Sequence, residues 1–87
     1  MKFSERYFSR ENRYVLGIEQ VSDRPYLGIP VSNRMVDYEE GYWLTPDQYE
    51  RFVEQPDLAA AFAAECRRRE HDDLLTLKPG RDRGTPR

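Results

Sequence analysis

The stretch Val36–Phe52 reads VDYEEGYWLTPDQYERF and contains the clearest structural signals in the chain. From Val36 to Leu44 the even-numbered positions are mainly apolar and the odd-numbered positions mainly acidic. Because successive side chains of a strand point to opposite faces, this alternation predicts a strand with one apolar and one acidic face. Trp43, the only tryptophan, falls on the acidic side of this strand.

The four residues Thr45-Pro46-Asp47-Gln48 predict the start of a helix directly after that strand. The Thr45 hydroxyl can accept a hydrogen bond from the Gln48 amide, while the Gln48 side chain can reach back to the Thr45 amide. Pro46 stands where a missing N–H has no cost, and Asp47 meets the positive end of the helix dipole. We therefore expect a helix that begins at Pro46.

Two further stretches with alternating side chains, residues 13–21 and 26–31, precede Val36–Phe52. Residues 22–25 and 32–35 are rich in the residue types that favour turns. The pattern predicts a three-stranded antiparallel meander.

The register of this meander follows from its apolar faces. Pairing Val21 with Tyr26 and Val31 with Val36 brings the apolar sides of all three strands together, which is the condition that specifies register. Pro30 conflicts with a central position, because proline cannot donate to the ladder. A bulge at Pro30, or a strand order other than that of the chain, would resolve the conflict.

Residues outside these strands complete the prediction. Met1–Asn12 is expected to be a loop or one or two helical turns, because polar residues interrupt its apolar ones. Gln55 or Asp57 can cap a second helix that runs to about Glu70, since Pro56 breaks the first helix. Cys66 lies on the apolar stripe of that second helix.

The C-terminal part is expected to add little to the core. Residues 74–77 form a short apolar run, interpreted as a last edge strand or an extended segment over the core, and residues 78–87 as a flexible basic tail. The predicted fold is thus a single α+β domain over residues 1–77, a three-stranded meander with 74–77 as a potential fourth strand, followed by two helices.

Size and composition narrow the class of protein. The chain has 87 residues and an aromatic fraction of 13%, which argues for one small folded domain rather than disorder. Its single cysteine excludes an internal disulfide framework and favours a reducing, cytoplasmic location. The longest uncharged apolar run, residues 58–64, is far too short to cross a membrane.

Negative charge concentrates in the middle of the chain. Residues 36–57 contain seven carboxylates and one arginine, a net charge of −6, between flanks that are mildly basic. Trp43 among these carboxylates has the composition of an interface hot spot, in which an aromatic anchors and charge steers the approach. The candidate partner-binding residues are Asp37, Glu39, Glu40, Trp43, Asp47, Glu50 and Glu54.

We expect a small non-catalytic protein that docks a basic protein partner. Immunity and antitoxin proteins that neutralise nuclease toxins share this size and charge, with carboxylates in place of the phosphates that the toxin binds. The alternative for Trp43 is a core position beneath the N-terminal segment or the second helix. A homodimer that buries Trp43 or the sheet edge is compatible with every function considered.

Catalytic, metal and cofactor sites are not predicted. His71 is the only histidine and lies in a charged helix end, where solvation is its simplest role. Cys66 and His71 are five residues apart on one helix, about 140° apart around its axis, and do not face each other. The carboxylates lack the spacing of a calcium loop.

The alternative function is a nucleic-acid-associated accessory domain. Its phosphate contacts would come from the arginine cluster and the basic tail, namely Arg67, Arg68, Arg69, Arg81 and Arg83. The net acidic charge of the chain, −2, disfavours this function, because binding by counterion release needs a basic footprint.

Overall fold

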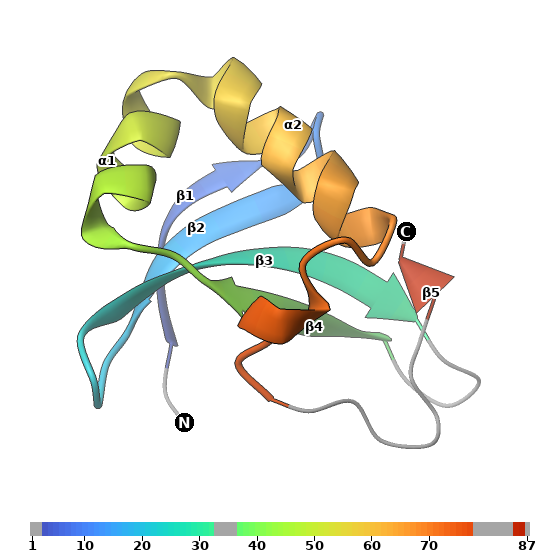
Figure 1. Ribbon diagram of the computed structural model, residues 1–87, viewed down its shortest axis with the longest axis horizontal. Coiled ribbons are helices and arrows are strands. Elements are labelled where there is room, and N and C mark those ends of the chain that lie inside the picture. Colours follow the sequence, from blue (N-terminus) through green and yellow to red (C-terminus); the bar gives the residue numbers. More distant parts are fainter. Residues whose placement is uncertain (1–2, 33–36, 78–84, 87) are drawn as a thin grey trace.

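Four antiparallel strands form a meander whose order in the sheet, β1-β2-β3-β4, is the order of the chain. The computed structural model describes residues 3–32, 37–77 and 85–86 (Figure 1). The elements are β1 (Phe3–Ser9), β2 (Tyr14–Glu19), β3 (Arg24–Ser32), β4 (Asp37–Trp43), α1 (Pro46–Glu54), α2 (Pro56–Arg67), the 3₁₀ turn η1 (Asp72–Leu74) and β5 (Thr85–Pro86). The predicted α+β class, with two helices after an antiparallel sheet, is confirmed.

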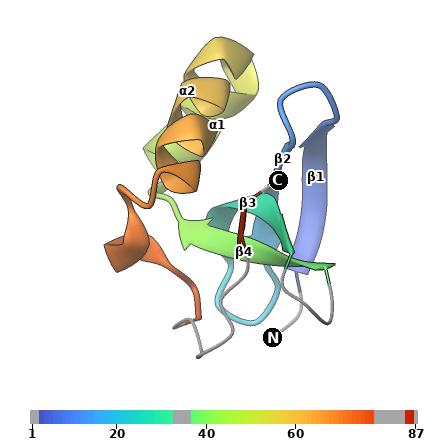
Figure 2. The same ribbon diagram turned by 90° about the vertical axis from the view of Figure 1, so that its right-hand side faces the viewer.

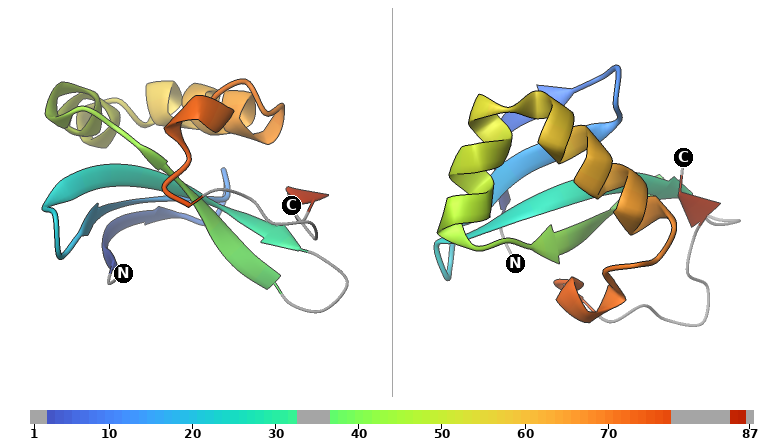
Figure 3. Two further views of the ribbon diagram at one scale, coloured as in Figure 1. Left: turned by 60° about the horizontal axis from the view of Figure 1, so that its bottom comes forward. Right: turned by 45° about the horizontal axis from the view of Figure 1, so that its top comes forward.

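Both helices cover the same face of the sheet. The left view of Figure 3 shows α1 and α2 together on one side of the strands, and Figure 2 shows β1 at the outer edge of the sheet, away from the helices. Cross-strand pairs such as Leu16 with Leu27, and Leu27 with Tyr42, point toward the helices. Their neighbours point the other way, to what we call the open face of the sheet.

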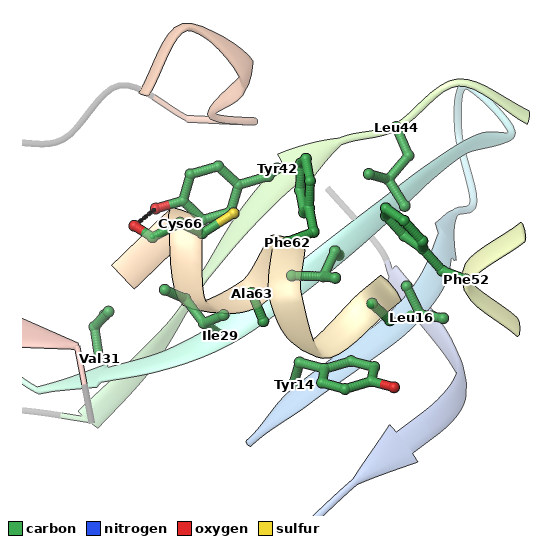
Figure 4. Close-up of a cluster of buried hydrophobic side chains, with 12 residues drawn as sticks. Tyr14, Leu16, Ile29, Val31, Tyr42, Leu44, Phe52, Phe62, Ala63 and Cys66 are labelled. Carbon is green, nitrogen blue, oxygen red and sulfur yellow. Dashed lines mark hydrogen bonds between the residues drawn. The ribbon is translucent and has the colours of Figure 1, made fainter. Parts of the chain in front are cut away.

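The core lies between this sheet face and α2 (Figure 4). Phe62, Ala63 and Cys66 of α2 are buried against the strands, and the rings of Phe52 and Phe62 lie 5.3 Å apart between centroids. The Tyr42 hydroxyl oxygen also lies 3.5 Å from the Cys66 carbonyl oxygen, a longer contact between β4 and the last turn of α2. Of the predicted apolar stripe of the second helix, Phe62 and Cys66 are part of the core, whereas Leu58 and Ala61 are exposed.

The observed register differs from the predicted one by an even number of residues. Tyr26 pairs with Gly17 rather than with Val21, and Val31 pairs with Tyr38 rather than with Val36. These are shifts of four and two residues, so each side chain keeps the face that the alternation assigned to it. Burial of the apolar side chains determines which face of the sheet each residue takes. The residues of the turn determine how far one strand is shifted along its neighbour.

The turn between β2 and β3 accounts for the larger shift. The Glu19 carboxylate accepts hydrogen bonds from the Val21 amide at 2.8 Å, the Ser22 amide at 2.9 Å and the Ser22 hydroxyl at 2.7 Å. Asp23, with φ of 57°, donates its amide to the Glu19 carbonyl. These contacts end β2 at Glu19, earlier than the alternation alone indicates.

Pro30 is accommodated without a bulge in its own strand. The ladder between β2 and β3 ends at the pair Val15 with Gly28, so β2 does not extend alongside Pro30. On the other side Pro30 lies opposite Glu39 of β4. The strand order of the chain therefore holds, and the conflict expected for a central proline is avoided because β2 is short.

The N-terminal segment was predicted incorrectly. Residues Phe3–Ser9 form β1, which adds a strand to the three predicted ones, and they do not form a loop or helical turns. Its register along β2 is irregular between Glu5 and Tyr7, and this irregularity breaks the alternation that a regular strand shows in its sequence. The sequence of β1 therefore does not show the alternation of apolar and polar residues that would have predicted a strand.

The helix start at Thr45 is confirmed. The Gln48 amide donates to the Thr45 hydroxyl at 3.1 Å, and the Thr45 amide donates to the Gln48 side chain at 2.8 Å. The second helix has Gln55 at its N-cap but no side-chain hydrogen bond there, and it ends at Arg67 rather than near Glu70.

Residues after α2 return to the sheet beside β4. Leu75 forms a single β-bridge with Tyr42, and the Thr76 amide donates to the Gly41 carbonyl at 2.9 Å. The apolar run 74–77 thus supplies one bridge and no strand of its own. In the predicted tail, Thr85 and Pro86 pair with β3, and residues 78–84 and 87 lie outside the described part of the chain.

Replacing Thr45 by alanine should lower the free energy of unfolding by about 1 kcal/mol, because the Gln48 amide loses its acceptor. Urea denaturation followed by circular dichroism measures the change. Thr45→Ser keeps the hydroxyl and should retain most of the stability; equal stability of Thr45→Ala and the parent chain would contradict a capping role.

Glu19 gives stability a specific pH dependence. The Ser22 hydroxyl, followed by the Val21 amide, holds the pKa of the Glu19 carboxyl below its ordinary value of 4.5. Its contribution is therefore present above that value and lost as the pH falls through the lower folded pKa. Glu19→Gln should reduce stability at neutral pH, and the difference from the parent chain should shrink in urea titrations at acidic pH. A difference that persists unchanged below the folded pKa would contradict this assignment.

Candidate functional site

The structure separates the predicted partner-binding residues into three places. Asp37, Glu39 and Trp43 lie on the open face of β4, because they alternate with the residues that point toward the helices. Glu40 points into the opposite layer. The three helical carboxylates, Asp47, Glu50 and Glu54, lie on exposed positions of α1. The predicted set is therefore not one continuous surface.

Glu40 is a buried residue, only 7% exposed. Its Oε1 atom accepts a hydrogen bond of 3.0 Å from the Tyr42 hydroxyl. A carboxylate in this position satisfies a buried donor and helps to orient Tyr42 beneath α2. It is not available to a docking partner, although the alternation in β4 already placed it on the apolar face.

Trp43 lies on the sheet rather than beneath the helices. Its side chain is half-buried, and it pairs across the strands with Tyr26. The guanidinium carbon of Arg24 lies 4.1 Å from the centroid of the indole, a cation–π contact. The indole is thus partly covered by a side chain of β3 and partly open to solvent.

The carboxylates of α1 form an acidic stripe, defined here as Asp47, Glu50 and Glu54. Spacings of three and four residues place them within about 60° of each other around the helix axis. Phe52 occupies the buried side of α1, and all three carboxylates are exposed. The stripe therefore projects directly into solvent from the helical layer.

A depression of about 290 Å³ with both apolar and polar lining residues lies between the two helices. We call it the interhelical groove. It is lined by Gln48, Arg51, Phe52, Leu58, Ala61, Phe62 and Glu65. Phe52 and Phe62 are buried and form its floor, whereas Leu58 is 39% exposed. α1 contributes to both the groove and the acidic stripe, and Arg51 lies between Asp47 and Phe52 around the helix axis.

His71 contacts the core rather than standing free in solvent. Its ring stacks on Phe62 with centroids 4.5 Å apart, and its Nε2 atom lies 2.7 Å from Oε1 of Glu65. This packing anchors the chain that leaves α2. The contacts give His71 a structural role at the end of the helical layer.

Cys66 is fully buried against the sheet. Burial, followed by the charge of Glu65, raises the pKa of its thiol to about 12. The thiolate that nucleophilic chemistry requires is therefore suppressed at neutral pH.

The arginines at the end of α2 already have partners. Arg67 donates to the carbonyls of Asn12, at 2.9 Å, and Arg13, and thereby attaches α2 to the turn between β1 and β2. Arg68 pairs with Glu70. Arg69 is exposed, and Arg81 and Arg83 lie outside the described residues. The contacts of Arg67 and Arg68 give no support to phosphate binding.

Comparison with known proteins provides no relative. No protein family, no curated protein and no solved structure matches this chain. Within residues 3–32, 37–77 and 85–86, no three histidine, cysteine or acidic side chains are grouped as metal ligands. No helix in the described part of the chain is long and apolar enough to cross a membrane.

Removing the Arg24 side chain should expose Trp43. Because Trp43 is the only tryptophan, acrylamide quenching of the intrinsic fluorescence reports on this residue alone. Arg24→Ala should increase the quenching constant and lower the free energy of unfolding by about 0.5–1 kcal/mol through loss of the cation–π contact. Arg51→Ala, on the far face, should leave quenching unchanged; equal quenching of both variants would contradict the stacking.

Proposed function

We propose that this chain is a small non-catalytic protein-binding domain that docks a basic protein through the acidic stripe and the interhelical groove. The observation that supports it most directly is that one helix, α1, carries the exposed acidic stripe and also contributes Gln48, Arg51 and Phe52 to the interhelical groove. Charge and apolar surface have complementary roles in such an interface. Neither role requires a reactive side chain.

The acidic stripe supplies the electrostatic part of the interaction. Asp47, Glu50 and Glu54 project outward, and Asp57 at the start of α2 is also exposed. Arg51 is the only basic residue of α1. A surface of this kind accelerates the approach of a positively charged partner and disfavours an acidic one.

The interhelical groove supplies the anchoring part. A partner side chain that enters it would contact the rings of Phe52 and Phe62 and displace water from Leu58. Burial of apolar area contributes roughly 25 cal/mol per Å², so one large side chain can stabilise the complex by about 2 kcal/mol. A few such anchors dominate the affinity of most interfaces.

We further propose that the partner is of the nuclease type and that docking neutralises it, as an immunity or antitoxin protein does. A catalytic site that accepts phosphates presents positive charge, and a row of carboxylates on a rigid helix can occupy it. The reducing cytoplasm is the proposed location, because the only thiol is buried and the sequence offers no disulfide.

Reversing two charges of the stripe tests the proposal. The partner is first captured with the parent chain from the native source, purified, and titrated by calorimetry. Glu50→Lys with Glu54→Lys should weaken binding about tenfold or more and reduce its salt dependence, because like charges then meet across the interface. Circular dichroism should show an unchanged fold, since both residues are exposed.

Two matched variants control for net charge and for the strand carboxylates. Glu11→Lys with Asp73→Lys changes the formal charge equally at exposed positions away from the stripe and should leave affinity within about twofold. Asp37→Lys with Glu39→Lys tests the open face separately, with Glu40 left intact because it is buried. Equal loss in the stripe variant and the net-charge control, or capture of an acidic partner only, would exclude docking through the stripe.

A further inference from the structure

The open face of the sheet carries a second depression, of about 310 Å³, which we call the sheet cleft. It is lined by Phe8, Arg10, Arg13, Tyr14, Val15, Gly28, Pro30, Tyr38 and Glu39. Its volume lies at the lower end of the range for small-molecule sites, which suits one amino-acid residue rather than a helix. Four strands contribute to the lining, so the cleft belongs to the most regular part of the fold.

The lining of the sheet cleft has an apolar part and a charged part. Val15 and Gly28 are buried, Pro30 is half-buried, and the Phe8 ring is 61% exposed. An exposed phenylalanine at the wall of a depression leaves apolar area that an apolar ligand group could cover.

Gly28 allows an acidic group to lie on the floor. A β-carbon at this position would stand 2.6 Å from both Cδ and Oε1 of Glu39. The absence of a side chain at Gly28 thus lets the Glu39 carboxyl cross from β4 onto β3. The floor therefore combines apolar surface with one hydrogen-bond acceptor.

Arg10 and Arg13 place two guanidinium groups at the end of the cleft. Both come from the turn between β1 and β2, and neither forms an ion pair with any residue that the structure describes. Arg67 lies behind the turn, bonded to the Arg13 carbonyl. Burial, followed by repulsion from Arg13, lowers the pKa of Arg67. Two arginines with no ion pair among the described residues thus lie at this end of the cleft, with the Glu39 carboxyl as the acidic group of the same lining.

We propose that the sheet cleft binds the C-terminal residue of a partner polypeptide. The free carboxylate would bind Arg10 and Arg13, whose planar guanidinium groups match a carboxylate in geometry. An apolar terminal side chain would cover Phe8 and Pro30. The backbone N–H of the same residue would donate to Glu39.

Other ligand classes match this lining less well. A hydrated inorganic anion would gain nothing from the apolar floor and supplies no N–H donor to Glu39. A cation would meet Arg10 and Arg13. A peptide end combines a carboxylate, an N–H donor and an apolar group within one residue, and each has a complementary group in the cleft.

This site is independent of the proposed docking through α1. The sheet cleft and the acidic stripe lie on opposite sides of the sheet, and no residue is shared between the cleft and the interhelical groove. Failure of either proposal therefore leaves the other untouched.

The test is a titration of the ¹⁵N-labelled full chain with N-acetyl-Gly-Leu as the free acid and as the amide. The acid should shift the amide resonances of Val15, Gly28 and Glu39 saturably. The amide should bind about tenfold or more weakly, because it removes a charge-assisted hydrogen bond. Arg10→Gln and Arg13→Gln should each weaken binding of the acid to a similar degree.

Arg51→Gln is the matched control, since it removes one guanidinium from the interhelical groove and should leave the titration unchanged. Isovalerate, which has the carboxylate and the branched chain but no N–H, should bind more weakly than the peptide acid. The proposal is overturned if acid and amide bind alike, if isovalerate equals the peptide, if Arg51→Gln is as damaging as Arg10→Gln, or if millimolar peptide shifts none of these resonances.

Discussion

One constraint governs this fold: a single apolar face of the sheet has to be covered by both helices. A chain of 87 residues can supply only one core, and most of its large buried side chains come from the same face of β2, β3 and β4 and from the two helices. Tyr26 is the exception, because it is fully buried on the other face of β3. The capping box at Thr45 begins α1 two residues after β4 ends, so the helical layer forms directly above the strand that leads into it. Glu40 and the Tyr42 hydroxyl are polar groups that this layer encloses, and they are hydrogen-bonded to each other.

Covering one face leaves the other without a helical layer, and the two sides differ in chemistry. The helical side presents carboxylates in a row and the interhelical groove. The open face presents a cleft with arginines at its end and an indole stacked on Arg24. A small domain can in this way offer two surfaces of different chemistry without a second core.

Local signals in the sequence predicted local structure well. Thr45 and Gln48 formed the expected cap, and the alternation assigned the correct face to Leu16, Leu27 and Tyr42. The offsets between strands were wrong by two and four residues, because they depend on how the Glu19 carboxylate ends β2, and a side-chain hydrogen bond of this kind has no periodic signature. β1 was missed because the irregularity near Arg6 interrupts its alternation.

The candidate surface was predictable only in part. The exposed helical carboxylates follow from α1 and its spacing, and the alternation in β4 already placed Glu40 on the apolar side, so its inclusion could have been avoided. Arg10, Arg13 and Phe8 could not be identified, since their role depends on β1 being a strand and on a turn that brings them toward Gly28.

Arg67 connects the helical layer to the hairpin between β1 and β2. Its guanidinium ties the last turn of α2 to the backbone of the hairpin that carries Arg10 and Arg13, while the preceding turns of α2 form one wall of the interhelical groove. One side chain therefore connects the helical layer to the hairpin at the end of the sheet cleft. The two surfaces share no lining residue, yet the elements that carry them are held together by the Arg67 side chain.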